Sequence, residues 1–240
     1  MNREVAKIFS TLVLSPKTVR VKLLGDSITN GHSGTGCCQN GDPIVAGYRR
    51  NQNGYCYANL LRDYLEANFN CRVINNGCNG VTIRFLIDYF SGLVDEEDDI
   101  LLINIGTNNR HQNYTTGPKR TRQQHMELVY NDILELYEKC KASGKQFVFI
   151  ANIPALREGD ADGYWRHIHM NDIHDLYVKA SCLYGFPLID LYTGMQEYCE
   201  QYGVALDELL ADGLHPNDRG YEVMFKLILK EIGIARKIDN

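Results

Sequence analysis

The chain alternates short apolar runs with longer segments of helical periodicity, and this alternation restricts its fold more than any other feature. Strands that alternate with helices pair in parallel, because each parallel pair needs a crossover connection. A parallel sheet is covered by helices on both faces. The sequence therefore predicts an α/β fold, a three-layer α/β/α sandwich around a central parallel sheet of five strands. The predicted strands are residues 19–24, 72–75, 100–104, 146–151 and 187–190, and the predicted helices are residues 55–68, 82–90, 120–142, 164–183 and 217–233.

No segment divides the chain into separate units. Its 240 residues contain no Pro-, Gly- or Ser-rich linker, no internal repeat and no low-complexity tract. We therefore expect residues 1–240 to form a single domain.

Charge and hydropathy exclude several classes of partner. The formal net charge of −5, without a basic patch, argues against nucleic acid, whose phosphates require a basic face. No run approaches the roughly 18 apolar residues that a membrane span needs. Glu4 and Lys7 interrupt the N-terminal segment, which therefore does not resemble a secretory signal. We expect a cytoplasmic protein whose eight cysteines are reduced, buried thiols, and the sequence leaves its oligomeric state open.

The segments that follow the strands are where a site is expected, since ligands of open parallel sheets bind at the carboxyl ends of the strands. The first of them, residues 25–54, is polar, rich in Gly, Asn and Cys, and longer than an ordinary connection, which indicates a functional loop. Ser27 lies at its start and is expected to face this edge of the sheet. The alternative is that Ser27 is a helix cap or a turn residue. Asp26 is expected to orient or cap the same turn.

Three later segments carry polar groups suited to acyl transfer. Residues 75–80 follow the second strand, and a glycine there lets a backbone N–H approach a ligand. Residues 106–109 follow the third strand and offer a side-chain amide. Asp212 precedes His215 by three residues, a spacing at which a carboxylate can hold an imidazole in one tautomer. The alternatives are a turn glycine, a loop asparagine and a capping aspartate, but all of these features occur in order at strand ends or at a helix start.

Together these motifs resemble the conserved blocks of the SGNH (GDSL-like) hydrolase superfamily. The resemblance implies a flavodoxin-like strand order, with Ser27 as nucleophile, His215 as base and Asp212 as its orienting partner. It also implies an oxyanion hole formed by the backbone N–H groups of Ser27 and Gly80 and by the side chain of Asn108. The matching segments are GDSIT at 25–29, NNGCNG at 75–80, GTNN at 106–109 and DGLHP at 212–216.

The implied activity is hydrolysis of carboxylic esters through an acyl-enzyme, without metal or organic cofactor. The 25–54 segment has no apolar stretch to hold a long acyl chain, which favours a short acyl group, such as acetyl, on a polar or carbohydrate alcohol. One position departs from the pattern, because many relatives have aspartate where this chain has Asn109. We expect that difference to affect the surroundings of the site and the choice of substrate rather than the class of reaction.

Three alternative functions remain open at this point. A lysophospholipase or a thioesterase could use the same motifs on a longer acyl chain. A non-catalytic binding module would be expected to lack Ser27, Asn108 or His215, and all three are present. A metal-dependent phosphoesterase would need a cluster of ligands elsewhere in the chain.

Residues 167–175 contain the histidines and aspartates that such a metal site could use. This segment is predicted to be helical, so that His167 and His174 lie two turns apart and His169 lies on another face. Surface or capping roles are therefore favoured over a metal site. The residues concerned are His167, His169, Asp172, His174 and Asp175.

Overall fold

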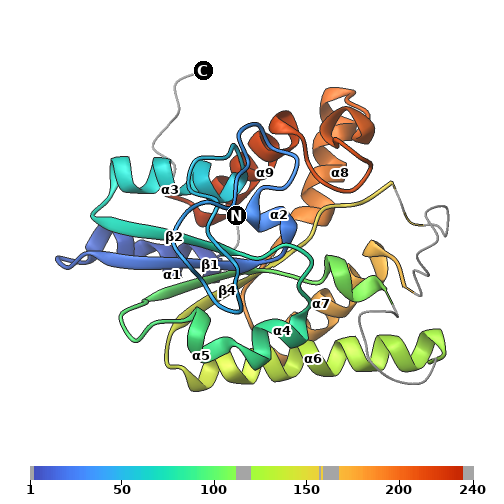
Figure 1. Cartoon of the computed structure of the whole chain (residues 1–240), viewed down its shortest axis with the longest axis horizontal. Coiled ribbons are helices and arrows are strands. Elements are labelled where there is room, and N and C mark those ends of the chain that lie inside the picture. The colour runs from blue at the N-terminus through green and yellow to red at the C-terminus, as the bar shows by residue number, and fades with distance from the viewer. Residues whose placement is uncertain (1–2, 112–119, 157, 159–167, 235–240) are drawn as a thin grey trace.

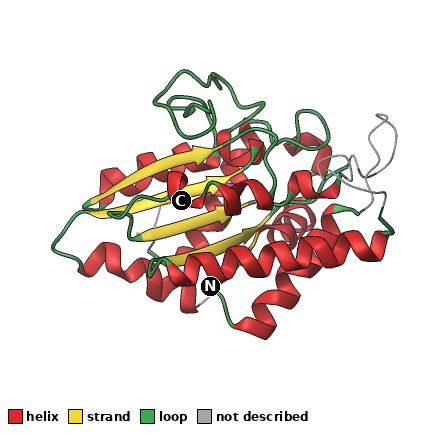
Figure 2. Cartoon of the chain, turned by 60° about the horizontal axis from the view of Figure 1, so that its bottom comes forward, coloured by secondary structure: helices red, strands yellow, loops and turns green. Residues whose placement is uncertain are grey.

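A computed structural model of the chain contains a central sheet of five parallel strands (Figures 1 and 2). It describes every residue except 1–2, 112–119, 157, 159–167 and 235–240. The strand order β2-β1-β3-β4-β5 is the flavodoxin-like order, so the predicted fold class and strand order are confirmed. The strands are β1 (Val19–Gly25), β2 (Cys71–Gly77), β3 (Ile100–Asn104), β4 (Gln146–Ala151) and β5 (Leu188–Asp190).

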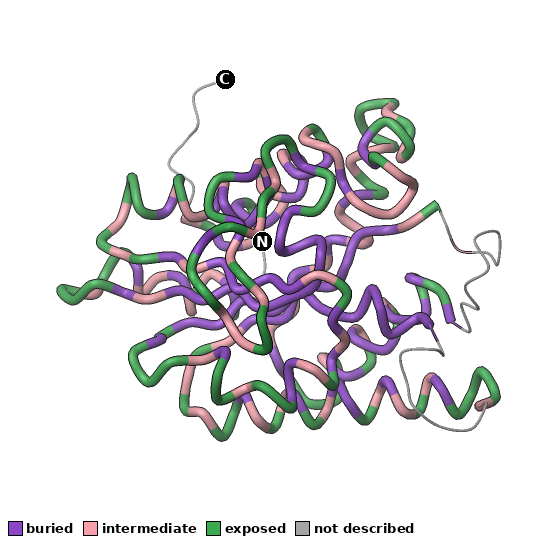
Figure 3. Tube along the Cα trace, in the orientation of Figure 1, coloured by how far each residue is buried: buried purple, intermediate pink, exposed green. Residues whose placement is uncertain are grey.

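Helices cover both faces of this sheet, which makes three layers (Figure 1). The main helices of one face are α1 (Arg3–Leu14), α3 (Tyr57–Asn68), α8 (Leu191–Tyr202) and α9 (Asp218–Ile232), and those of the other are α4 (Ile83–Asp88), α5 (Phe90–Leu93), α6 (Arg122–Ala142) and α7 (Met170–Tyr184). The all-buried strand β3 shows the division: Ile100 and Leu102 pack into the first layer, Leu101 and Ile103 into the second. Figure 3 shows the buried strands between helices with exposed outer faces.

The predicted helices are present, with some shifts of their ends. The segment predicted at 82–90 is divided into α4 and α5, which meet at Tyr89. Helix α7 begins at Met170 rather than at residue 164, and residues 164–167 lie outside the described part of the chain. The strand predicted at 72–75 extends from Cys71 to Gly77, because its last residues pair with the end of β1.

Two of the longer helices, α1 and α8, were missing from the prediction. Helix α1 occupies the N-terminal segment and buries Val5, Phe9 and Leu12 against the sheet, each contributing about 1.5–3 kcal/mol of hydrophobic stabilisation. Helix α8 buries Leu191 and Met195, and the carboxylate of Asp190 caps it by accepting the N–H of Thr193 at 2.9 Å.

The 25–54 segment begins with a single helical turn, α2 (Ser27–Asn30), in place of the irregular loop expected there. Asp26 caps this turn, since its Oδ1 accepts the N–H of Ile28 at 3.0 Å. Two asparagine side chains hold its far end: Asn75 donates to the carbonyl of Thr29 and Asn51 to the carbonyl of Asn30. The turn is buried, so Ser27, its first residue, has a fixed position.

The remaining expectations about the chain concern cysteines and membranes. All eight cysteines are free thiols, but the expectation that they are buried is correct only for Cys56, Cys78 and Cys140; Cys38 and Cys182 are exposed. Among the helices that the structure describes, none combines the length and the apolar composition that crossing a bilayer requires.

Candidate active site

Ser27, His215 and Asp212 form one row of polar contacts at the carboxyl end of β1. Ser27 Oγ lies 2.9 Å from His215 Nε2, although 188 residues separate them in the sequence. On the other side of the imidazole, Nδ1 lies 2.9 Å from Asp212 Oδ2. The structure therefore brings together the three residues that the sequence motifs singled out.

The turn from Asp212 to His215 is fixed by the aspartate itself. Its Oδ1 accepts the backbone N–H groups of Leu214 at 3.0 Å and of His215 at 2.8 Å. Gly213 takes a φ of +79°, in the left-handed region that favours glycine. A bridge between Leu210 and Pro216 closes this loop just before α9 begins. Asp212 and His215 are three residues apart because they lie at the two ends of one hydrogen-bonded turn.

Burial favours the neutral form of His215. It lowers the pKa of His215; Asp212 raises that pKa, and electrostatic interactions with His32 and Arg110 lower it further. Burial would raise the pKa of Asp212, but hydrogen bonds from His215 and Leu214 outweigh this and hold it at about 2. Because the ionised Asp212 accepts the proton on Nδ1, Nε2 of a neutral His215 is left as an acceptor facing Ser27.

Gly80 comes from the loop after β2, and Asn108 from the short 3-10 helix Thr107–Arg110 after β3; these two strands lie on either side of β1. The amide of Asn108 donates to the carbonyl of Val81 at 2.8 Å, which ties the two segments together. Gly80 is exposed with a φ of +76°, and no heavy atom lies within 4 Å of the position that a Cβ would occupy there. Both residues therefore follow strands next to β1, at the edge of the sheet where ligands of this fold bind.

Asn109 lies in the short 3-10 helix Thr107–Arg110, and its side chain caps the start of α4. Its Oδ1 accepts the N–H of Ile83, the first residue of α4, at 3.0 Å. An aspartate would present the same acceptor oxygen, so the departure at this position preserves the contact that the structure shows.

Sequence reasoning missed a buried charge beneath the site. Arg110 has no exposed surface; its Nη1 pairs with Glu158 at 3.0 Å and its Nε donates to the carbonyl of Thr107. Burial raises the pKa of the enclosed Asp26 to about 6, against the opposing effects of Ile28, Thr107 and Arg110. No pattern in the sequence separates Arg110 from an ordinary loop arginine.

His32 was also missed. It is exposed, and its ring lies beside that of His215, with centroids 4.4 Å apart and ring planes at 58°. It follows Ser27 by five residues in the polar 25–54 segment, where nothing in the sequence distinguishes it.

The residues considered for a metal site have other partners. His174 contacts Asp190 at 3.0 Å and Asp175 at 3.4 Å. Asp172 accepts the backbone N–H of His169 at the start of α7. His167 lies outside the described residues. Within the described part of the chain, no group of three or more His, Cys, Asp or Glu side chains is arranged to hold a metal ion.

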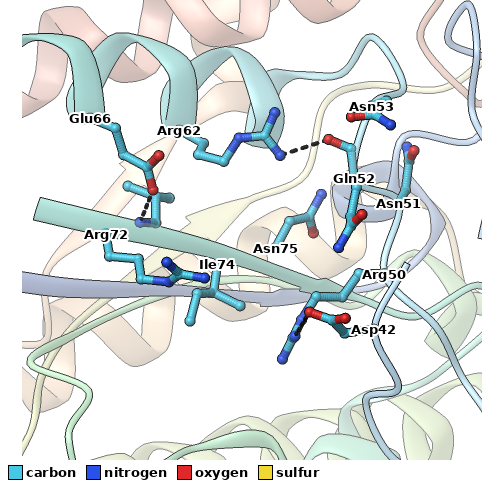
Figure 4. A pocket seen from close by; sticks show the side chains of 11 residues that line it. Asp42, Arg50, Asn51, Gln52, Asn53, Arg62, Glu66, Arg72, Ile74 and Asn75 are labelled. Atoms are coloured by element: carbon cyan, nitrogen blue, oxygen red, sulfur yellow. Dashed lines mark hydrogen bonds and ion pairs between the residues drawn. The ribbon is translucent and has the colours of Figure 1, made fainter. Parts of the chain in front are cut away.

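A separate recess of about 300 Å³ lies against the edge strand β2, and Figure 4 shows its polar walls. The residues of the row do not line it. Arg50, Arg62 and Arg72 contribute to the walls, as do Asn51 and Asn75, whose amides hold the carbonyls at the end of α2. Two side chains in the wall of this recess therefore hold the helical turn α2, which carries Ser27.

Comparison with known families identifies the chain. The sequence profile of the GDSL-like Lipase/Acylhydrolase family matches residues 23–223. The chain belongs to this family. The family consists of lipases and acylhydrolases, which favours an ester hydrolase over the alternative of a non-catalytic binding module.

Individual relatives agree with this family assignment. The chain is 27% identical over 263 aligned positions to a multidomain esterase from Ruminococcus flavefaciens, an alignment that covers 95% of the chain. It spans only about a third of that relative, 31% of its length.

Solved structures of other proteins share the fold. Axe2, an acetylxylan esterase from Geobacillus stearothermophilus, superposes with a TM-score of 0.67 at 18% identity, covering 92% of this chain and 98% of Axe2. A putative GDSL-like lipase from Parabacteroides merdae superposes with a TM-score of 0.68 at 21% identity, covering 91% and 97% of the two chains.

Proposed function

We propose that this GDSL-like hydrolase is a serine esterase that removes short acyl groups, acetyl above all, from a polar or carbohydrate alcohol. The observation that carries the proposal is the row from Ser27 Oγ through His215 to Asp212, with both contacts at 2.9 Å. A serine hydroxyl is a weak nucleophile unless a base lies within hydrogen-bond reach of it. Neutral His215, with its Nε2 facing the hydroxyl, meets that requirement.

In the acylation step, His215 Nε2 takes the proton of Ser27 as Oγ attacks the ester carbonyl carbon. The carbonyl π electrons move onto oxygen and give a tetrahedral oxyanion. When this intermediate collapses, the bond to the alcohol oxygen breaks and that oxygen takes the proton from Nε2. The alcohol leaves, and the acyl group remains on Ser27.

Deacylation repeats this sequence with water. His215 removes a proton from water as the water oxygen attacks the acyl carbon, and it returns the proton to Ser27 Oγ as the acid leaves. Asp212 stays ionised throughout and stabilises the imidazolium that forms in each half of the cycle.

The oxyanion is assigned to three donors: the backbone N–H groups of Ser27 and Gly80 and the amide of Asn108. One amide hydrogen of Asn108 is used by the carbonyl of Val81, which orients the side chain and leaves the second hydrogen for the substrate. Donors fixed before the reaction stabilise developing charge without reorganising at the moment of attack.

The substrate class rests on two observations. The segment beside the nucleophile is polar: His32, Ser33, Thr35 and Gly36 are all exposed. Among the relatives, Axe2 is an acetylxylan esterase, and its variants described as catalytic mutants replace a serine, an aspartate and a histidine, with the aspartate three positions before the histidine. Asp212 and His215 have the same spacing.

A panel of 4-nitrophenyl esters from acetate to palmitate, together with an acetylated sugar, tests the proposal. We expect kcat/KM to fall as the acyl chain lengthens, and a serine-directed phosphonate to abolish activity. A maximum at long acyl chains would instead indicate a lysophospholipase or a thioesterase. Inactivation by a chelator without inhibition by the phosphonate would indicate a metal-dependent phosphoesterase.

A further inference from the structure

His32 lies beside the proposed base but makes none of the contacts of the Ser27–His215–Asp212 row. Its ring centroid is 4.4 Å from that of His215, and the ring is exposed to solvent. An exposed polar ring so close to the reacting groups is available to any substrate that reaches Ser27.

The backbone of His32 is held firmly even though its ring is exposed. Its N–H donates to the carbonyl of Ser27 at 2.9 Å, and its carbonyl accepts the hydroxyl of Tyr221 at 2.7 Å. Tyr221 is completely buried in α9. The ring therefore projects from a backbone anchored both to the nucleophile and to the helix that follows His215.

The turn before His32 also has little freedom. Gly31 takes a φ of +98°, and a Cβ there would lie 2.7 Å from the Cβ of the buried Cys56. The direction in which the chain leaves α2, and hence the place of the His32 ring, is set by this close approach.

The chemistry of ester cleavage indicates which part of a substrate would lie near His32. In the proposed reaction, His215 Nε2 returns its proton to the oxygen of the leaving alcohol, so that oxygen must come within hydrogen-bond reach of Nε2. The alcohol portion then lies alongside the imidazole of His215. An imidazole has one nitrogen that donates and one that accepts when neutral, which suits a hydroxyl group.

We infer that His32 is a substrate-binding residue on the leaving-group side of the site, and that it hydrogen-bonds a hydroxyl of the alcohol close to the ester. This inference rests on the proposed function and narrows its substrate class: the preferred ester has a hydroxyl adjacent to the acylated oxygen, as in a partly acetylated sugar ring.

Two acetate esters with ring alcohols of similar size provide the test. A monoacetylated pyranose carries free hydroxyls next to the ester, and cyclohexyl acetate carries none. Both form the same acetyl-enzyme, so any difference in kcat/KM between them arises in binding and acylation and not in deacylation.

Three variants separate hydrogen bonding from packing. His32→Ala removes the ring, His32→Phe keeps a ring beside His215 without its nitrogens, and His32→Gln keeps a donor and an acceptor. We expect His32→Ala and His32→Phe to lower kcat/KM for the acetylated sugar about three- to tenfold, the range for one hydrogen bond. Cyclohexyl acetate should change by less than about twofold, and His32→Gln should retain part of the preference for the sugar.

The control variant is His169→Ala, which replaces another exposed histidine and should leave both esters unaffected. Equal losses on the two esters for His32→Ala, or no loss on either, would overturn the role of His32 while leaving the esterase intact. Inactivity of the wild type on both esters would instead overturn the proposed function, and the inference with it.

Discussion

Asp212 holds His215 at two points, the ring and the backbone: Oδ2 contacts Nδ1 at 2.9 Å, and Oδ1 accepts the backbone N–H at 2.8 Å. One carboxylate thus sets both the tautomer of the imidazole and the turn that presents it. Each of the two functions can be tested by substitution, because an amide can replace only one of them.

Asp212→Asn should preserve the turn from Asp212 to His215 but should no longer hold the imidazole of His215 in one tautomer. The amide oxygen can still accept the backbone N–H groups, so the melting temperature should stay close to that of the wild type. The amide nitrogen cannot accept the Nδ1 proton, and we expect kcat to fall by about 10⁴. Ester hydrolysis and thermal unfolding of the variant measure the two effects. A loss of less than tenfold would show that Asp212 does not orient His215.

The acid side of the pH profile should lie below the ordinary histidine range. Burial, His32 and Arg110 together outweigh Asp212 and lower the pKa of His215 from the reference value of 6.5. The base must be neutral to accept the Ser27 proton, so kcat/KM should be lost as the pH falls through this lowered pKa. Measurement from pH 4 to 9 on a soluble acetate ester determines the midpoint. A midpoint above 6.5, or a flat profile between pH 5 and 8 with the protein folded, contradicts the role of His215.

Asn108→Ala should affect the transition state more than the bound substrate. Loss of one oxyanion donor is expected to lower kcat by about 10²–10³, or roughly 3–4 kcal/mol, with little change in KM. Steady-state kinetics on variants that retain the wild-type circular dichroism spectrum provide the comparison. If KM rises and kcat is unchanged, Asn108 binds substrate and the oxyanion donors lie elsewhere.

Asn109 offers a test of the one departure from the family pattern. Its Oδ1 caps the start of α4 through Ile83, so Asn109→Asp should preserve the free energy of unfolding within about 1 kcal/mol. Asn109→Ala leaves the buried N–H of Ile83 without an acceptor and should cost about 1–3 kcal/mol. Urea unfolding distinguishes the two variants, and equal stability of both would show that the cap contributes nothing.

Much of this architecture could be predicted because it depends on local sequence patterns, such as apolar runs and helical periodicity. The five strands were found from apolar runs, and β3, buried on both faces, has only apolar residues before its terminal asparagine. Asp212 and His215 were found because they share one turn. Ser27 could be connected to them only through the family resemblance, since no pattern in the sequence relates residues 188 positions apart.

The missing parts depend on packing rather than on pattern. Helix α1 buries only Val5, Phe9 and Leu12, and the charged residues between them made this apolar stripe hard to recognise in the sequence. Helix α8 buries just Leu191 and Met195, too few for a clear periodicity. The proximity of His32 and Arg110 to His215 could be recognised only from the three-dimensional structure. When tertiary structure brings a single side chain into a site, the residues next to it in the sequence do not indicate its role.

The central claim, that Ser27 is the nucleophile, is tested most directly by the hydrolysis of 4-nitrophenyl acetate by Ser27→Ala. Ser33→Ala is the matched control, because Ser33 is an exposed serine in the same segment. The account predicts that Ser27→Ala lowers kcat by about 10⁶ at unchanged thermal stability, while Ser33→Ala retains full activity. A Ser27→Ala variant that keeps a tenth or more of the wild-type rate would contradict it.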